Sequence, residues 1–418
     1  MPKLQTEPLD ALVVGGGPAG SVAALELARA GWRVLLVDRG PRGRDKTCGS
    51  CLSPRAIATI ERLGLSDAVK RAAVGATRAV RLCVANRQTL TLAHESQAGA
   101  AGLVVDRRVL DCALLDEAMA AGVEVRHETA AAIVGANAAG PVSDPLGVPH
   151  QVRLLATAAG ARGKDAHQRG VGLGVDREAD AAPHSHTIEA RLLVGADGLG
   201  SGVARALGWT GTAGRAFGFS GDTPGEAMKA LEPGEIRMHL LSEGYLGAVR
   251  RSDGRVHWGA LVRESTLDRR PSAVLARFAA QFELAELTRC AKAATWIAAG
   301  PISWAPRHRA AAGVALVGDA AGYAEPLTGE GMAWAFECGE LLGRIARGSR
   351  PGCFSAADAA RYDAAWQSSI GTSQRRARRM AMALRMPRLA ATIGRVVPAL
   401  PRALVARLTA VPGAKLTA

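Results

Sequence analysis

The stretch LDALVVGGGPAG, residues 9–20, decides the fold of this chain. Its first half, residues 9–14, is a short apolar run typical of a fully buried strand. Its glycines follow the G-x-G-x-x-G spacing and are Gly15, Gly17 and Gly20. Residues 21–30 favour a helix, and residues 33–37 favour a second buried strand. A strand–turn–helix–strand unit with these glycines indicates a dinucleotide-binding fold.

Each glycine of the motif has a physical role. Gly15 makes the tight turn, Gly17 lets the backbone approach a pyrophosphate, and Gly20 lets the helix pack close to the strand. The start of the helix, with Pro18 and Ala19, offers free N–H groups and the positive end of the helix dipole to the phosphates.

The second strand ends at Asp38, eighteen residues after Gly20, and Arg39 follows it. A carboxylate at this place accepts hydrogen bonds from a ribose 2′-OH, whereas an arginine in its stead would indicate a 2′-phosphate. On these residues alone the dinucleotide is either NAD or FAD.

Composition predicts a protein of two or three lobes. The chain has 418 residues, of which 48% are hydrophobic and only 4% aromatic, so the interior is rich in alanine, valine and leucine. The N-terminus leads straight into the first strand and there is no apolar run of eighteen residues, so we expect neither a signal peptide nor a spanning helix. We expect a cytoplasmic protein whose seven cysteines are mostly buried thiols.

The net charge of +14 is concentrated at the C-terminal end. Residues 364–418 contain ten basic residues and no acidic one. Residues 374–410 form a basic amphipathic run interrupted by prolines. It favours either peripheral contact with an anionic membrane, at the inner membrane surface, or helices that pack on the dinucleotide lobe. Without interleaved aromatic residues we expect no nucleic-acid binding.

Cys48 and Cys51 lie in a basic, glycine-rich loop and have C-x-x-C spacing. They are compatible with a redox dithiol, with half a zinc site that nothing completes, or with two loop thiols beside a ligand. We favour the last for Cys51, and predict no metal. His184 and His186 lie in a polar excursion, residues 158–186, and are expected to be solvated.

A separate β-rich lobe is predicted between the glycine motifs. Residues 79–85 and 88–93 alternate as a hairpin, and three further alternating segments, 236–241, 245–250 and 255–262, predict antiparallel strands. A helix is expected over 271–287 and a strand region over 293–304. Its polar and aromatic residues can line a pocket, but no spacing singles out an acid or base among His239, Tyr245, His257, Trp258, Trp296 and Trp304.

Two later strand ends repeat the phosphate-binding pattern. Residues 187–194 run into Gly195-Ala196-Asp197-Gly198, and residues 315–317 run into Gly318-Asp319. An acidic residue beside glycines at a helix start is a geometry found next to phosphates and sugar hydroxyls. The turn at 325–332 then presents bare backbone N–H groups at another helix N-terminus.

These three motifs, in this order and spacing, resemble the p-hydroxybenzoate-hydroxylase-like FAD superfamily, which includes class A flavoprotein monooxygenases and geranylgeranyl reductases. The resemblance covers about residues 8–350. It implies an α/β fold in which a Rossmann-like FAD-binding domain of the GR2 type carries an inserted antiparallel β-sheet substrate domain and a helical C-terminal tail. The expected FAD-binding domain is discontinuous, with residues 1–75, 100–210 and 305–350; the substrate domain has residues 76–99 and 211–304, and the basic helical segment residues 351–418.

The resemblance also implies the FAD-binding residues. The ADP part would be held by Gly15, Gly17, Pro18, Ala19, Gly20, Asp38 and Arg39. The remainder of the cofactor would be contacted by Cys48, Gly49, Arg107, Asp197, Gly198, Gly318, Asp319, Pro326, Gly329, Gly331 and Met332. Of these, Cys48 is the one side chain singled out as a catalytic candidate.

The resemblance implies an FAD-dependent oxidoreductase reduced by NADPH or NADH. We favour a monooxygenase that uses O₂, through a flavin C4a-hydroperoxide, to hydroxylate a hydrophobic aromatic, phenolic or polyketide-type molecule, because residues 244–249 lack the Trp and Phe-Pro pair expected of prenyl reductases. Residues 45–49 and 326–331 resemble the geranylgeranyl-reductase branch instead, which reduces C=C bonds of isoprenoids or lipids. The third alternative is a binding protein with this fold and no activity.

Overall fold

The predicted dinucleotide-binding unit stands at the centre of an eight-stranded sheet in the computed structural model of the chain. β1 (Leu9–Val14) pairs in parallel with β2 (Val34–Val37) on one side and with β11 (His186–Gly195) on the other. The intervening helix α1 (Pro18–Arg29) begins three residues earlier than predicted. Gly17 is its N-cap, and Pro18 suits the first turn because the N–H that proline lacks has no helical partner there.

The structure describes residues 7–84, 88–93, 102–135, 149–157, 185–241, 243–263 and 296–384, with Ala273, Ala276, Phe278 and Ala280. Outside this range lie residues 158–184 of the excursion predicted at 158–186, with His184, most of the predicted helix at 271–287, and residues 385–418. His186, placed in the excursion by the prediction, is instead the first residue of β11.

Other strands extend the first sheet and bring the three glycine motifs to one edge. They are β8 (Glu124–Arg126), β9 (Thr129–Gly135), β10 (His150–Ala156), β17 (Ala310–Ala311) and β18 (Val314–Leu316). The order is β17-β18-β11-β1-β2-β8, with β10 joined to β11 and β9. Since β18, β11 and β1 are parallel, the segments that follow them lie at the same edge of the sheet.

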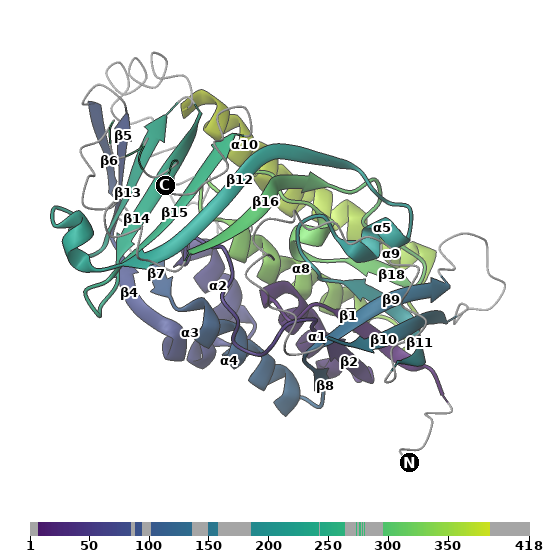
Figure 1. Ribbon diagram of the computed structural model, residues 1–418. Helices are drawn as coiled ribbons and strands as arrows, with labels where there is room; N and C mark the ends of the chain where they lie inside the picture. The colour runs from purple at the N-terminus through teal and green to yellow at the C-terminus, as the bar shows by residue number, and fades with distance from the viewer. Residues whose placement is uncertain are drawn as a thin grey trace, which may run out of the picture.

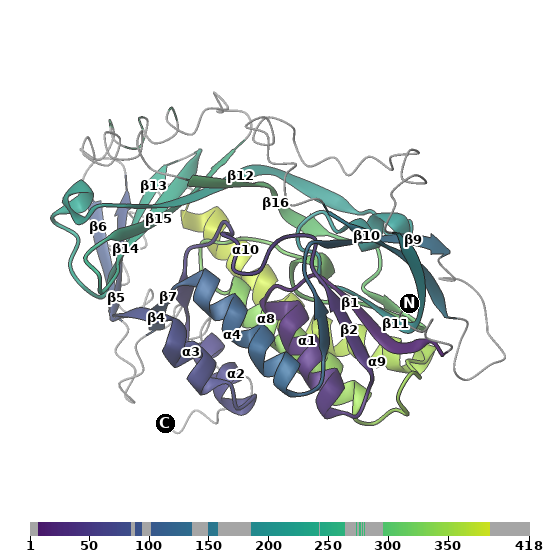
Figure 2. The same ribbon diagram turned by 60° about the horizontal axis from the view of Figure 1, so that its bottom comes forward.

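Three long helices form a layer against this sheet (Figure 2): α1, α4 (Arg107–Ala120) and α8 (Gly331–Ala346). α1 and α8 approach closely because Gly339 and Gly343 present bare backbone to α1. A Cβ on Gly339 would lie 2.7 Å from Val22 Cγ1, and one on Gly343 would overlap Glu26. The close packing fixes the direction in which the N-terminus of α1 points.

A small three-stranded sheet and two short helices follow the basic loop. The strands are β3 (Cys51–Leu52), β4 (Ala73–Thr77) and β7 (Gly102–Val105), and the helices are α2 (Pro54–Arg62) and α3 (Ser66–Ala72). The predicted cap of α2 is confirmed, since Ser53 Oγ accepts a hydrogen bond from Ala56 N. α3 and this small sheet were not predicted. The remaining helices of the described chain are α5 (Gly202–Ala206), α9 (Ala356–Trp366) and α10 (Thr372–Leu384), with short turns η3 (Gly225–Met228), η5 (Gly318–Ala321) and η6 (Gln367–Gly371).

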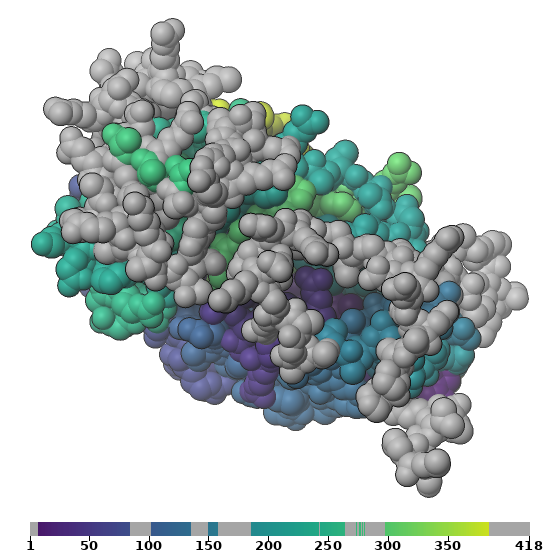
Figure 3. All heavy atoms as spheres, viewed as in Figure 1, coloured from purple at the N-terminus to yellow at the C-terminus, as the bar shows by residue number. Residues whose placement is uncertain are grey.

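The second large sheet has seven strands in the order β16-β12-β15-β14-β13-β5-β6. Its strands are β5 (Ala79–Val84), β6 (Gln88–Ala93), β12 (Thr212–Thr223), β13 (Glu235–Leu241), β14 (Gly244–Arg250), β15 (Val256–Arg263) and β16 (Trp296–Ala305). The predicted hairpin of β5 and β6 joins it through a parallel pairing of β5 with β13. It lies beside the first sheet (Figure 1), and in Figure 3 its teal surface borders the blue surface of the N-terminal helices.

The two faces of the seven-stranded sheet have different neighbours. On one face Phe219, Leu246 and Trp258 form a core with Phe278. On the other face an apolar cluster that includes Tyr245 packs against Tyr323 and Leu327, which lie in the segment 318–332 that we call the third motif. The second face therefore looks toward the edge at which the glycine motifs meet.

The start of the basic C-terminal segment is anchored in the core. Arg55 on α2 forms a bidentate ion pair with Glu337 on α8, with both N···O distances 2.6 Å, and its third nitrogen donates to Ser373 Oγ on α10. Trp334 Nε1 also donates to Ser373 Oγ, and Gln374 Nε2 donates to the carbonyl of Gly322. In the described residues, no helix has the length and apolar character needed to cross a membrane.

The contact of α1 with α8 predicts the effect of one added methyl group. We expect Gly339→Ala to lower the melting temperature, because overpacking costs about 1–3 kcal/mol whereas alanine in a helix returns at most about 1 kcal/mol. Thermal unfolding followed by circular dichroism measures the effect. The matched control is Gly348→Ala, where the nearest atom to the new Cβ lies 3.4 Å away and no loss is expected. Equal melting temperatures of the two variants would contradict the packing argument.

Candidate cofactor site

The three glycine motifs meet around the first turn of α1. A Cβ on Gly20 would overlap the carbonyl oxygen of Gly15, and one on Gly15, whose φ is +114°, would overlap the carbonyl of Ala196 in the second motif. Gly318 of the third motif, with φ +60°, lies so close that its Cβ would be 2.5 Å from Ala19 Cβ. These approaches place bare backbone from three segments around one helix N-terminus.

Asp38 lies at the end of β2, as predicted, and organises the adjacent turns. Its two carboxylate oxygens accept hydrogen bonds from the backbone N–H groups of Gly16 and Gly40, both at 2.8 Å. The Arg44 guanidinium lies 3.2 Å from the same carboxylate. The Arg39 side chain is exposed, and its carbonyl oxygen accepts a hydrogen bond from Thr157 Oγ1.

Two cations stand beside the glycine turn. Lys46 Nζ is 3.5 Å from the position of a Cβ on Gly17, and it pairs with Asp111 at 2.8 Å. Arg107, at the first position of α4, pairs with the same carboxylate at 3.0 Å. Positive charge at this place complements a pyrophosphate. Lys46 and Asp111 were not predicted, although the i,i+4 spacing of Arg107 and Asp111 was a usable signal.

Cys48 and Arg107 are brought together by the loop before β3. Burial lowers the pKa of the Arg107 guanidinium, but its interactions with Asp111 and with the nearby Cys48 side chain outweigh burial and raise that pKa overall. Cys48 Sγ accepts a hydrogen bond from the backbone N–H of Ser50 at 3.3 Å. Burial raises the pKa of the Cys51 thiol to about 12, and both cysteines are free thiols in the structure.

Asp197 caps a helix. Its carboxylate accepts hydrogen bonds from the backbone N–H groups of Gly202 and Val203 at the start of α5, at 2.6 and 3.1 Å. Gly198 follows with φ +82°, and no atom lies within 4 Å of the place of its Cβ. The segment thus leaves open space beside Gly198.

Asp319 lies in η5, directly after the strand end that the sequence predicted. Burial raises the pKa of its carboxyl to about 6, and the charge of Arg107 acts in the opposite direction. A carboxyl that is hard to ionise in this site is well suited to hydrogen bonds with sugar or ribityl hydroxyls.

The loop before α8 carries a buried acid. Pro326 and Gly329 close a turn through a backbone hydrogen bond of 2.9 Å, Gly331 begins α8, and Met332 is buried in it. The Glu330 side chain is 2% exposed, and its carboxylate oxygens accept no close hydrogen bond from the described residues. Burial raises the pKa of Glu330 to about 7, against the opposing effects of Arg55 and Ser53.

The seven-stranded sheet forms a wall above this edge. Pairing of β13, β14, β15 and β12 places Leu240, Tyr245, Leu261 and Gly218 in one row on the same face. Tyr245 Oη donates to Glu325 Oε1 at 2.8 Å, which ties the wall to the third motif. Around Tyr245 the wall is apolar, whereas Ser220, Asp222 and His257 make its part next to the Cys48 loop polar.

Among the residues that the sequence left undecided, Tyr245 and His257 lie on this wall. By strand alternation His239 and Trp258 lie on the opposite face, and Trp304 donates from Nε1 to the carbonyl of Ala320.

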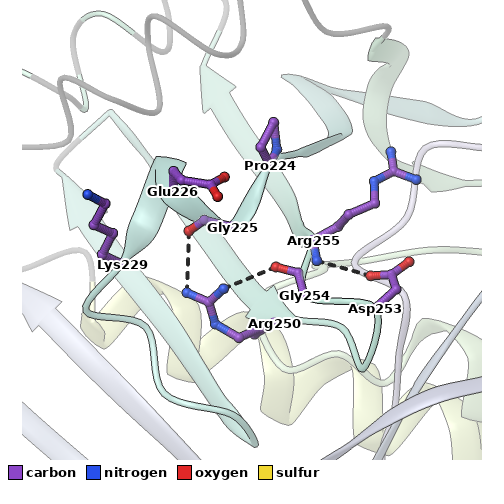
Figure 4. Close-up of a pocket in the computed structure, with 8 residues that line it drawn as sticks. All are labelled: Pro224, Gly225, Glu226, Lys229, Arg250, Asp253, Gly254 and Arg255. Atoms are coloured by element: carbon purple, nitrogen blue, oxygen red, sulfur yellow. Dashed lines mark hydrogen bonds between the residues drawn. The ribbon is translucent and has the colours of Figure 1, made fainter.

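A surface hollow of about 620 Å³ opens at the end of the same sheet (Figure 4). Arg250 lies across it, and its guanidinium donates to the carbonyls of Gly254, Gly225 and Met228. An arginine used in this way holds turns together, since four of its five N–H donors bind backbone carbonyls. None of the glycine motifs lines this hollow.

Comparison with known proteins identifies an FAD-binding domain. Residues 8–171 match the family model described as FAD binding domain. The matched stretch is an FAD-binding domain of the kind found in p-hydroxybenzoate-hydroxylase-like flavoproteins. The protein is an FAD-dependent oxidoreductase.

Several known proteins are similar to this flavoprotein over most of its length. It is 26% identical to digeranylgeranylglycerophospholipid reductase 1 of Methanopyrus kandleri over 81% of this chain and 80% of that one. A geranylgeranyl bacteriochlorophyll reductase-like protein from Thermoplasma acidophilum shares the fold with a TM-score of 0.71, at 18% identity, over 97% and 92% of the two chains. P. aeruginosa PqsL, solved with 2-aminobenzoylacetate, has a TM-score of 0.68 at 20% identity over 93% and 100%.

The described residues fit FAD at this edge. No atom lies within 4 Å of a Cβ built on Gly49, Gly198 or Gly329, so backbone there is open to a ligand. The buried hydroxyls of Thr47 and Thr328 have no hydrogen-bond partner in the described chain, as expected of groups that a cofactor completes. The same part of the chain contains no cluster of three or more metal-ligating side chains.

The buried Glu330 predicts a pH dependence of stability. Because its pKa is raised on folding, the folded protein retains a proton that the unfolded chain releases, so stability falls as pH rises from about 4.5 to about 7. Glu330→Gln removes this loss. We expect the FAD-loaded variant to melt higher than the wild type at pH 8, with the difference vanishing near pH 4.5.

The control for this series is Glu61→Gln, which changes an exposed glutamate on α2 and is expected to leave the wild-type profile unchanged. A Glu330→Gln variant that melts lower than the wild type at pH 8 would show instead that the carboxylate is stabilised there.

Proposed function

We propose that this FAD-dependent oxidoreductase reduces C=C bonds of a long apolar, isoprenoid-type substrate and takes its reducing equivalents from NADPH or NADH. The observation that carries the proposal is the apolar wall of the seven-stranded sheet facing the third glycine motif. The similarity to a digeranylgeranylglycerophospholipid reductase over 81% of the chain supports the same reading.

The wall suits an extended hydrocarbon better than a small polar ring. Leu82, Met238 and Leu240 come from the neighbouring strands β5 and β13 and lie on the same face as Leu261 and Ile302. They pack toward Leu327 of the third motif. A surface of this kind binds by excluding water and offers few hydrogen bonds.

Reduction of a C=C bond requires a hydride and a proton. Bound FAD, once reduced, supplies the hydride. The proton must come from the protein or from water, and the Cys48 thiol is our candidate donor, because the loop holds its Sγ beside Arg107. Lys46 and Arg107 would hold the pyrophosphate, and Asp319 the ribityl hydroxyls.

Hydroxylation of a phenolic or polyketide-type molecule is the second candidate. The hydrogen bond from Tyr245 to Glu325 favours it, because this polar pair in an apolar wall offers an anchoring point for a phenolic hydroxyl. Residues 244–249, which contain Tyr245, are also where the chain departs from the pattern expected of prenyl reductases.

Oxygen dependence separates the two reactions. We expect the purified FAD-loaded protein, with NADPH or NADH and a geranylgeranyl lipid, to form products heavier by two hydrogens per reduced double bond at the same rate in air and under argon. Mass spectrometry of the lipid measures this. If instead a compound from a panel of phenols gains one oxygen atom, and does so only in air, the reaction is a hydroxylation and the reductase proposal fails. Cys48→Ala is expected to lower turnover while FAD remains bound, and Cys353→Ala serves as the control.

We further propose that α10 brings the protein to an anionic membrane surface, where a lipid substrate resides. Arg375, Arg376, Arg378 and Arg379 are all exposed on this helix. Met382, 51% exposed, adds an apolar group one turn further on. Clustered arginines with an exposed apolar residue bind anionic bilayers through charge and shallow insertion.

Vesicle sedimentation tests the membrane proposal. We expect the protein to pellet with vesicles that contain phosphatidylglycerol, but not with phosphatidylcholine alone, and to be released by salt. Replacing the four arginines of α10 by glutamine should abolish binding. Replacing Lys70, Lys229, Arg344 and Arg350, which are exposed elsewhere, removes the same charge and should leave binding nearly intact. An equal loss of vesicle binding in both variants would show that the net charge of the protein, and not α10, causes the binding.

A further inference from the structure

His257 on β15 makes a hydrogen bond with each ring nitrogen. Nδ1 is 2.8 Å from Asp222 Oδ1 on β12, and Nε2 is 2.8 Å from the carbonyl oxygen of Cys48. Carboxylate and carbonyl oxygens accept hydrogen bonds and do not donate them. The two ring nitrogens of His257 therefore link Asp222 to the Cys48 peptide.

The other side of Cys48 is held by the same sheet. The backbone N–H of Cys48 donates to Ser220 Oγ, at 3.3 Å, and Ser220 lies on β12 two residues before Asp222. Gly259 on β15 lies next to this loop, since a Cβ there would be 3.8 Å from both the Cys48 carbonyl oxygen and Gly49 Cα. The peptide groups on both sides of Cys48 are therefore bound to two neighbouring strands.

Asp222 is in turn held by arginines of the β14–β15 turn. Arg251 and Arg255 each lie 3.5 Å from its second oxygen, and Arg251 also pairs with Asp253 and with Asp106. Burial raises the pKa of Asp222, but the hydrogen bond from His257 and these charges lower it overall, so the carboxylate stays ionised.

The network also reaches the partner of the Cys48 thiol. Asp106 is the N-cap residue of α4, and Arg107, beside Cys48 Sγ, is the first residue of that helix. The sheet thus determines both where the Cys48 peptide lies and where α4 begins.

We propose that His257, supported by Asp222, is a positioning residue that fixes the Cys48 peptide and thereby directs Cys48 Sγ into the cofactor site next to Arg107. This role is the same whether the reaction is a reduction or a hydroxylation, so it does not rest on the proposed substrate. The hydrogen bond to the Cys48 carbonyl is the element that performs it.

The test measures how often the loop opens, through alkylation of Cys48 in the full-length, FAD-loaded protein at pH 8. Iodoacetamide labelling is followed by mass spectrometry of the tryptic peptide 47–55, in which fragment ions separate Cys48 from Cys51. His257→Leu removes both hydrogen bonds at similar volume. Loss of the hydrogen bond to the Cys48 carbonyl raises the population of the open loop, and we expect labelling of Cys48 to become about tenfold faster.

Two isosteric variants separate positioning from general support of the fold. The amide nitrogen of His257→Gln can replace Nε2 and reach the Cys48 carbonyl, whereas that of His257→Asn can replace only Nδ1 and reach Asp222. We expect Gln to restore slow labelling and Asn to label as fast as Leu. This pair decides the question even if His257→Leu does not fold.

Cys51 in the same peptide reports general loosening, and its labelling should stay slow in every variant. His186→Leu, at an exposed histidine on β11, should behave as the wild type. Wild-type labelling of Cys48 in His257→Leu, or labelling of His257→Gln as fast as that of His257→Asn, would overturn the proposal.

Discussion

Close approach of bare backbone around α1 is the constraint on which the rest of the structure depends. The helix contacts the turn that precedes it through Gly20, the third motif through Ala19 and Gly318, and α8 through Gly339. Each contact is nearer than a side chain would allow, so the direction of α1 is determined on three sides. Because the helix N-terminus is what a pyrophosphate recognises, the same packing that stabilises the core also orients the cofactor site.

The loop between β2 and β3 connects the two large sheets at this point. Its first residues lie over the glycine turn, where Lys46 pairs with Asp111, and its last residues rest on the wall, where Ser220 and His257 hold Cys48. Both anchors are polar, whereas the wall around Tyr245 is apolar. Hydrogen bonds and an ion pair hold this short loop at both ends. The loop can therefore place the Cys48 thiol and the Lys46 charge between the two large sheets.

The dinucleotide unit could be predicted from the sequence because each of its elements has a local signal. Alternating strands such as β13 to β15 were predicted for the same reason, and so was the cap of α2 by Ser53. β12 was not predicted as a strand, because residues 212–223 have no clear apolar alternation. Pairing with β15 and β16 along its length stabilises it as a strand.

The residues of the candidate site also fall into two groups, those that have a local sequence signal and those that do not. Glycines and strand-end aspartates have characteristic spacing, and the sequence located Gly15, Asp38 and Asp319 at the edge where the structure has them. His257 and Ser220 act through backbone groups of a loop about two hundred residues away, and neither has a local pattern that marks this role. The position of Lys46 beside Gly17 could not be predicted either, because it depends on how the loop folds back over the glycine turn. Long-range pairings of this kind are set by the tertiary structure, and a single sequence does not display them.

The hydrogen bonds of Ser373 determine how far the chain can be shortened from its C-terminal side. Ser373 accepts from Arg55 and Trp334, both of which are buried between α2 and α8. A chain cut before Thr372 would leave the indole N–H and one guanidinium nitrogen without an acceptor in the interior, and the carbonyl of Gly322 without the Gln374 amide. The first turn of α10 is therefore part of the folded core. A shortened chain that keeps the flavin site intact must still contain Ser373 and Gln374.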